Sequence, residues 1–423
     1  MPRTSGETTK SAIVDHAWKL FCRKAYDCTS VNEIVRAAGI SKGAFYFHFK
    51  SKGDLAAAVV EKHREHFISS LDEVFLGSDW PKCARRLAEA CFPGAGRGSF
   101  SVEPLVQLGV KFASCEPALL DQAAISLGRS EARIAAALKC AGWSARESAS
   151  RAGSVMACLQ GHFVRSALAG SVETPRALAG DISRFVLPKP ADSAKPVRSS
   201  GAARGSFGRK AVARFQEIAE KHLDTVDSRS IMAVGGAMGK GFKEKRSRII
   251  TEAALQLWRH GYEGSRVSGI LENCGIPKGS FYYYFDSKQS LALAALDCHS
   301  RFFSEALDAV FRAEDWPAAV DAFCRLLKWM AEKSGTFVPT LTSLGLEFVG
   351  GDEELAGKIT GVLSGAEKKF ARAISAYRGS GGRAAREAAL AVALWKGHMS
   401  RLAIYRDEGI LTHLRRDLTA IVS

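Results

Sequence analysis

Apolar residues recur at intervals of three and four positions along most of the chain, which is the spacing of one face of an α-helix. Near the start, Ile13, Ala17 and Leu20 follow this spacing, and a longer helical pattern begins near Leu55. No sustained alternation of apolar and polar residues bounded by turn signals occurs, and glycine and proline fall between the helical stretches. The pattern therefore predicts an all-α protein.

The whole helical pattern occurs twice. When the sequence is shifted by 236 positions, residues 26–55 align with residues 262–291 without a gap. The stretch LDEVFLGSDWP at 71–81 aligns in the same way with LDAVFRAEDWP at 307–317. A repeat of this length is a duplicated domain and not a solenoid repeat. The sequence thus predicts two copies of about 178 residues, joined by a connector of about 58.

One stretch of each copy reads as a helix, a tight turn and a second helix. In the first copy, Ile34 lies on an apolar stripe, and Gly39 permits the left-handed conformation that a short turn between helices requires. Ser41 is placed to cap the second helix, and Phe45 and Phe49, four residues apart, attach it to the core. This is the layout of a helix-turn-helix, whose second helix enters the major groove of DNA.

A helix in the major groove needs small residues near its start, where its backbone approaches the DNA, and phosphate-binding side chains around it. Both copies provide these residue types at equivalent positions. The small residues are Gly43 and Ala44 in the first copy, and Gly279 and Ser280 in the second. The predicted phosphate-binding residues are Lys42, Tyr46, His48 and Lys52, and Lys278, Tyr282, Tyr284 and Lys288.

These residues resemble the N-terminal domain of TetR-family transcriptional regulators, through the K-G-x-x-Y-x-x-F core and the following S-K-x-x-L. The resemblance covers about 50 residues of each copy. It implies a three-helix DNA-binding domain, a larger helical domain with a small-molecule effector pocket, and dimerisation through the last two helices. It also adds Thr29 and Ser30, and Ser265 and Arg266, to the expected DNA contacts.

The duplication predicts a division into five parts. The DNA-binding domains are 8–68 and 243–304, the regulatory and dimerisation domains are 69–187 and 305–423, and a basic linker occupies 188–242. The first part of the linker is rich in proline, alanine, serine, glycine and basic residues, which predicts a solvated tether. Its second part has the spacing of a short amphipathic helix through Phe215, Ile218, His222 and Val226.

A glycine–histidine pair lies in a late helix of each copy. Gly161 and His162 occur in LQGHFVR, and Gly397 and His398 occur at the equivalent place in WKGHMSR. A glycine inside a helix costs about 1 kcal/mol relative to alanine, and it often marks close packing between helices. The resemblance places this helix in a dimer-forming four-helix bundle. We therefore expect all four residues at the dimer interface, with the two glycines as spacers.

The two copies differ at positions expected to face DNA. In the second copy, Pro277 and Arg266 each replace a serine, and Asp286 replaces a lysine. We call the helix-turn-helix domain of each copy its head. These differences predict that the two heads recognise different half-sites, and therefore that the operator is asymmetric. A second interpretation stays open, in which the second copy has lost DNA binding and serves as an interaction or sensing partner of the first. Pairing of the copies within one chain is the simplest assembly, and a homodimer is the alternative.

The composition of the chain agrees with a DNA-binding protein and adds no further function. A net charge of +15 and a pI near 9.4 favour a polyanionic partner, here double-stranded DNA. The ten cysteines occur singly, which is typical of a reduced intracellular protein without a zinc site. An N-terminal signal and an 18-residue apolar run are both lacking, so we expect a cytoplasmic protein. Catalytic motifs are also lacking, and the sequence predicts neither an enzyme nor a cofactor.

Overall fold

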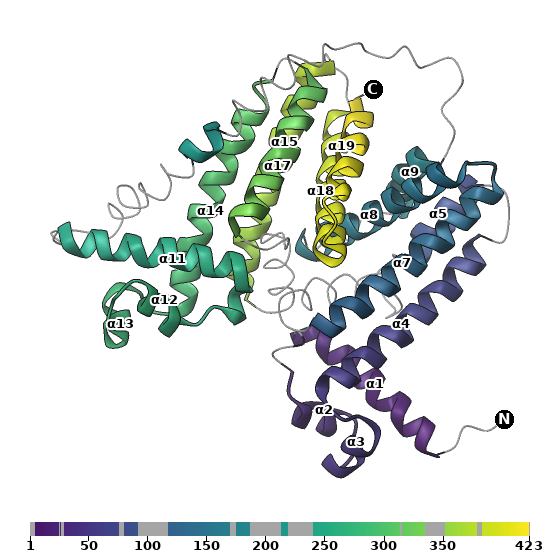
Figure 1. Cartoon of the computed structure of the whole chain (residues 1–423), viewed down its shortest axis with the longest axis horizontal. Helices are drawn as coiled ribbons and strands as arrows, with labels where there is room; N and C mark the ends of the chain where they lie inside the picture. The colour runs from purple at the N-terminus through teal and green to yellow at the C-terminus, as the bar shows by residue number, and fades with distance from the viewer. Residues whose placement is uncertain are drawn as a thin grey trace. The chain divides into compact units, whose positions relative to one another are not determined.

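The computed structural model describes residues 5–24, 26, 29–75, 80–91, 117–169, 175–186, 213–218, 240–313, 315–334, 352–378 and 383–422. Every regular element within these residues is a helix, which confirms the predicted all-α fold (Figure 1). The chain divides into two compact units. The first contains the described residues of 1–188 together with 393–407, and the second contains those of 189–348, 352–392 and 408–423.

The first copy begins with three helices that form its helix-turn-helix head. The head is followed by the long helix α4, which packs against both α1 and α7, while α5 packs against α9 and α8 packs against α7 and α9. The bounds are α1 Ser5–Lys24, α2 Val31–Ala37, α3 Lys42–His48, α4 Lys52–Val74, α5 Trp80–Cys91, α7 Pro117–Cys140, α8 Ala145–Ala169 and α9 Pro175–Val186.

The second copy repeats part of this pattern of packing. Helix α14 packs against α11 and α17, as α4 packs against α1 and α7, and α15 packs against α19 as α5 packs against α9. The bounds are α11 Lys240–Gly264, α12 Val267–Asn273, the 3-10 helix η1 Lys278–Ser280, α13 Phe281–Tyr284, α14 Lys288–Val310, α15 Trp316–Ser334, α17 Glu353–Arg378, α18 Ala384–Tyr405 and α19 Gly409–Val422.

A small apolar core holds the first head together. Phe21 of α1, Phe45 of α3, and Leu55 and Val59 of α4 are all fully buried in one cluster. Burial of each of these side chains stabilises the fold by roughly 1.5–3 kcal/mol. Because the cluster joins α1, α3 and the start of α4, it fixes the orientation of α3 on the rest of the head.

The compact units do not follow the duplicated sequence everywhere. Residues 393–407 belong to the second copy by sequence, yet their contacts place them in the first unit. Helix α18 therefore contributes residues to both units. Periodicity alone gives no sign of this exchange, because it shows which face of a helix is apolar and not what covers that face.

The linker helix predicted from Phe215 onward is described over residues 213–218. Phe215 and Ile218 are buried there, while Arg214 and Glu217 are exposed and form an ion pair at 2.6 Å. The predicted continuation through His222 and Val226 lies outside the described residues. Among the helices that the structure describes, none is long and apolar enough to span a membrane.

Candidate DNA-binding interface

Serine side chains define the start of both short helices in the first head. Ser30 forms a capping box with Glu33, in which the Ser30 hydroxyl accepts from the Glu33 amide at 3.2 Å and the Ser30 amide donates to the Glu33 carboxylate at 2.9 Å. Gly39 has the predicted positive φ of 65°. The Ser41 hydroxyl accepts from the amide of Ala44 at 3.1 Å, which confirms the predicted cap of α3.

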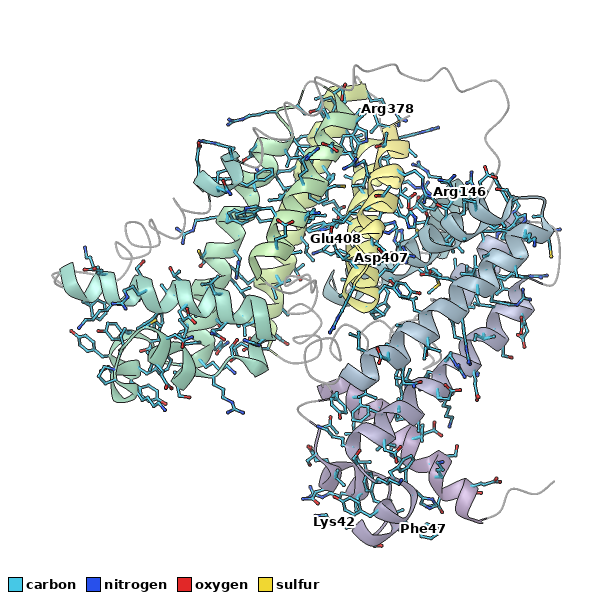
Figure 2. The ribbon with its side chains drawn as sticks, viewed as in Figure 1. Lys42, Phe47, Arg146, Arg378, Asp407 and Glu408 are labelled. Carbon is cyan, nitrogen blue, oxygen red and sulfur yellow. The ribbon has the colours of Figure 1, made fainter. Side chains whose placement is uncertain are left out.

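The recognition helix α3 has a buried side and an exposed side. Phe45 and Phe49 are buried, as predicted, while Tyr46 is 51% exposed and Phe47 is 84% exposed. Lys42 and Gly43 are exposed at the start of the helix, and Ala44 and His48 are half-buried. Figure 2 shows Lys42 and Phe47 at the outer edge of the first head.

The second head has the same helix-turn-helix arrangement as the first, but its two short helices begin differently. Arg266 stands before α12 without a side-chain cap, and Gly275 has a φ of 62° that matches Gly39. Because Pro277 has no capping side chain, the recognition segment begins as the 3-10 helix η1 and becomes α-helical only at Phe281. The segment exposes Lys278, Gly279, and the rings of Tyr282 at 78% and Tyr283 at 65%, while Ser280 and Tyr284 are half-buried.

Four of the predicted DNA-contact residues are held within the heads. Thr29 and Ser265 are buried, and the Ser265 hydroxyl donates to the carbonyl of Gly261 at 2.6 Å. The Lys52 ammonium lies 4.2 Å from the centroid of the Tyr26 ring and donates to the Tyr26 carbonyl at 3.1 Å. The ammonium of Lys288 lies 4.4 Å from the centroid of the Tyr262 ring, at the equivalent place.

Sequence reasoning missed two exposed aromatic residues, Phe47 and its equivalent Tyr283. The signal was present, because each lies two positions from both buried phenylalanines of its helix, and two positions in a helix correspond to the opposite face. The chemistry of the two side chains differs. A phenyl ring offers only apolar contact, whereas the Tyr283 hydroxyl also donates and accepts hydrogen bonds.

Each head is attached to its long helix through an equivalent histidine. The imidazole of His63 lies 3.6 Å from the ring of Trp18 between centroids, and His299 contacts the carbonyl of Ala254 at 2.9 Å. Burial lowers the pKa of both histidines to about 4. Both rings are therefore neutral at pH 7 and act as packing groups between the head and the long helix.

The glycine–histidine pairs expected at a dimer interface lie within the first compact unit, where residues 393–407 meet α8. A Cβ atom at Gly161 would overlap the carbonyl oxygen of Ala393, and a Cβ atom at Gly397 would overlap the carbonyl oxygen of Ala157. Ala157 and Ala393 are themselves equivalent positions of the two copies. The approach is thus reciprocal, and only glycine fits at its two closest points.

Buried polar groups surround this close approach. Arg401 donates to both carboxylate oxygens of Glu131, at 2.7 and 3.1 Å, and to the Nδ1 atom of His398 at 3.3 Å. A Cβ atom at Gly153 would lie 2.7 Å from the Arg401 guanidinium, so this glycine leaves room for the arginine. His162 lies 3.3 Å from a carboxylate oxygen of Asp181 on α9.

The side chain of Lys396 is a buried cation without a counter-charge among the described residues of this region. The Lys396 ammonium is fully buried and has no hydrogen-bond partner among the described residues, although it lies 3.9 Å from the centroid of the Trp395 ring. Burial lowers the pKa of Lys396 to about 7. The residues that the structure describes contain no cluster of histidine, cysteine or acidic side chains suited to a metal ion.

Two helices joined by a glycine turn, with a recognition helix that exposes lysine and aromatic side chains, define a helix-turn-helix DNA-binding protein. The N-terminal domain of the tetR family of bacterial regulatory proteins matches the chain at residues 13–59 and again at 249–295. These two matches, together with relatives named as HTH-type transcriptional regulators, support a tandem duplicated TetR-like regulator. The resemblance found in the sequence is confirmed.

Several curated relatives are named as HTH-type transcriptional regulators. An uncharacterized HTH-type transcriptional regulator of Lactococcus lactis is 28% identical over 142 residues, which cover 32% of this chain and 71% of that protein. The regulator AcrR of Shigella flexneri is 39% identical over 59 residues, 14% of this chain and 27% of AcrR. The negative regulator IcaR of the Staphylococcus epidermidis biofilm operon is 34% identical over 62 residues, 15% of this chain and 34% of IcaR. The last two matches span about a third or less of the relatives' length.

Proposed function

We propose that the chain is an effector-responsive repressor that binds an asymmetric operator as a single-chain pseudo-dimer. Both helix-turn-helix heads would contact DNA, and a small molecule in one or both regulatory domains would change the distance between the heads. Such an effector must bind the DNA-bound and free conformations with different affinities, because a ligand with equal affinity shifts no equilibrium. Repression is the usual role implied by the family resemblance, and IcaR is named as a negative regulator.

The proposed pseudo-dimer is supported by a reciprocal close approach, of Gly161 to Ala393 and of Gly397 to Ala157. In a twofold interface, if residue i of one subunit meets residue j of its partner, then j also meets i. The glycine contacts follow this rule with the two copies of one chain as the subunits. We accordingly assign Gly161, His162, Gly397 and His398 to the pairing surface of the copies.

The charged pair Arg401 and Glu131 supports the same assignment. The arginine belongs to the second copy and the glutamate to the first, and the pair is bidentate and largely buried. The sequence carries an arginine at 165 and a glutamate at 367, at the equivalent positions. A buried charge left without its partner costs several kcal/mol, so such a pair favours one register of the helices over others.

Unlike half-sites follow from the unlike surfaces of the two heads. Phe47 in the first head suits apolar contact such as a thymine methyl group, whereas Tyr283 also suits a phosphate or base edge. Asp286, which is exposed in the second head, repels phosphate where Lys50 of the first head attracts it. The predicted contacts at the start of each recognition helix are otherwise alike, with Lys42 and Lys278 both exposed.

The proposal is tested by selecting bound fragments from random duplex DNA with the purified full chain, and by weighing the complex with light scattering. We expect one 45.6 kDa chain on two unlike half-sites. Two chains on one symmetric site would mean that the copies pair between chains. Absence of any enriched sequence at moderate salt would overturn the proposed operator binding itself.

A second candidate function is favoured by the missing helix caps at Arg266 and Pro277. In this alternative the second head binds no DNA, and the second copy serves as a structural or sensing partner of the first. The substitutions Lys42→Ala and Lys278→Ala, measured separately on the selected operator, distinguish the two functions. Weaker binding in both variants supports two active heads, whereas weaker binding in Lys42→Ala alone supports the alternative.

A further inference from the structure

The first two turns of α11 carry more basic side chains than the equivalent residues of the first head. Residues 241–248 contain four basic residues and one acid, which gives a net charge of +3. The equivalent residues of the first copy, 5–12, contain one lysine and one glutamate, with a net charge of zero. The four basic residues are Lys243, Lys245, Arg246 and Arg248.

Two of these basic residues stabilise the head, and two are available to a ligand. The Arg246 guanidinium lies 4.7 Å from the centroid of the buried Phe285 ring, and Arg248 donates to the carbonyl of Cys274 at 2.8 Å. Lys245 is exposed and Lys243 is half-buried. Neither lysine forms an ion pair or a hydrogen bond with any residue that the structure describes. No described residue therefore competes with an anion for their ammonium groups.

An aromatic contact fixes these two turns against the recognition segment. The ring of Phe242 is stacked on Tyr284, with centroids 5.0 Å apart and an angle of 24°, and meets Tyr283 edge-on, also at 5.0 Å. Phe242 lies in the same helical turns as Lys243 and Lys245, so the contact holds the part of α11 that carries both lysines next to α13. The first copy has Gly6 at the equivalent position, which offers no ring for such a contact.

Figure 1 shows α13 below the N-terminal half of α11, in agreement with the stacking of Phe242 on Tyr284. Offset-stacked and edge-to-face rings are the favoured arrangements of aromatic side chains. The start of α11 is thus attached to the recognition segment through side chains, and not only through the helix that follows it.

We propose that Phe242, Lys243 and Lys245 form a phosphate-binding surface of the second head, here called the α11 basic surface. It would bind the DNA backbone beside the groove that η1 and α13 enter. This inference rests on the proposed operator binding and adds a contact that the first head does not have. Its electrostatic role is to offset the repulsion between phosphate and Asp286, so that the second head binds without the lysine that the first has there.

The test measures affinity by fluorescence anisotropy with the full chain, on the selected operator and on a random duplex, at several salt concentrations. The double variant Lys243→Gln/Lys245→Gln removes two phosphate contacts. Each contact contributes about 0.9 to the slope of log K against log salt, so we expect the slope to fall by about 1.8. At about 0.1 M salt this corresponds to a loss of affinity on the order of 50-fold, on both duplexes.

The matched control is Lys139→Gln/Lys368→Gln, which removes the same charge from exposed positions on α7 and α17. We expect it to change the slope far less, because these lysines lie outside the DNA-binding heads. A second pair of variants tests the aromatic attachment without changing charge. Phe242→Ala should weaken binding by about 5-fold, whereas Phe242→Tyr, which keeps the stacked ring, should restore it.

The outcomes separate this proposal from the proposed function. If the wild-type chain binds its operator and the lysine double variant matches it in slope and affinity, the α11 basic surface is refuted while operator binding stands. Equal effects of the α7/α17 control would likewise refute a local contact. If the wild-type chain binds neither duplex, both proposals fail. Thermal unfolding of each variant checks that the head remains folded.

Discussion

The uncompensated ammonium of Lys396 leads to a quantitative prediction about stability and pH. The side chain is fully buried, and burial lowers its pKa from 10.5 to about 7. Replacing it by methionine keeps a similar shape and removes the charge. Because one pKa unit is equivalent to about 1.4 kcal/mol, the variant should be more stable by about 4 kcal/mol at pH 7.

The sign of the pH dependence follows from proton binding. Between about pH 7 and pH 10.5 the unfolded chain holds a proton on Lys396 that the folded chain lacks, so the stability of the wild type rises with pH in this window. The advantage of Lys396→Met should accordingly shrink to about 2 kcal/mol at pH 9 and vanish above pH 10.5. The Trp395 ring attracts the charged form and reduces these values by roughly 0.5–2 kcal/mol.

The assay is thermal unfolding followed by circular dichroism at pH 7 and pH 9, with wild type, Lys396→Met and the control Lys368→Met. Lys368 is exposed on α17, and its replacement should change the unfolding midpoint little at either pH. A shift for Lys396→Met that is absent, opposite in sign, or equal at both pH values would refute the assignment of an uncompensated buried amine.

Three further predictions concern caps, close packing and the buried ion pair. Ser41→Ala should destabilise the first head by about 1 kcal/mol, measured as faster amide exchange in α3, because it removes the cap of that helix. Gly161→Ala should lower the unfolding temperature sharply, because its Cβ overlaps a carbonyl oxygen, whereas Gly357→Ala on the open face of α17 should be neutral or stabilising. Glu131→Gln should cost about 3–5 kcal/mol in denaturant unfolding, since it leaves Arg401 buried without its carboxylate, and a loss below 1 kcal/mol would contradict the pairing.

The helix-turn-helix could be predicted from the sequence because its determinants are local. The turn glycine at Gly39, the cap at Ser41 and the buried Phe45 and Phe49 all lie within eleven residues, and each has a conformational or packing preference of its own. The structure confirms all four. The roles assigned to the exposed residues of the heads stay predictions, because the fold does not show what touches them.

The features that the sequence did not reveal depend on contacts between distant residues. Phe242 and Tyr284 stack across 42 positions, and nothing in the periodicity of either segment indicates the partner. The placement of residues 393–407 in the first compact unit is of the same kind, as is the burial of Lys396. A lysine inside an apolar helical face predicts an exposed or snorkelling side chain, so its complete burial could come only from the packing of the folded chain.

The two heads share the helix-turn-helix arrangement but are stabilised by different local contacts. The second head lacks the serine caps at Arg266 and Pro277, which together would contribute about 2 kcal/mol. In the same head, the stack of Phe242 on Tyr284 contributes about 1 kcal/mol, and the hydrogen bond from Arg248 to the Cys274 carbonyl about 1.5–3 kcal/mol. These contributions are of the same size, so the missing caps do not by themselves imply an unfolded or inactive second head. Under the proposed function, the differences between the heads would therefore bear first on which DNA each one contacts, and an operator with unlike halves is the expected consequence.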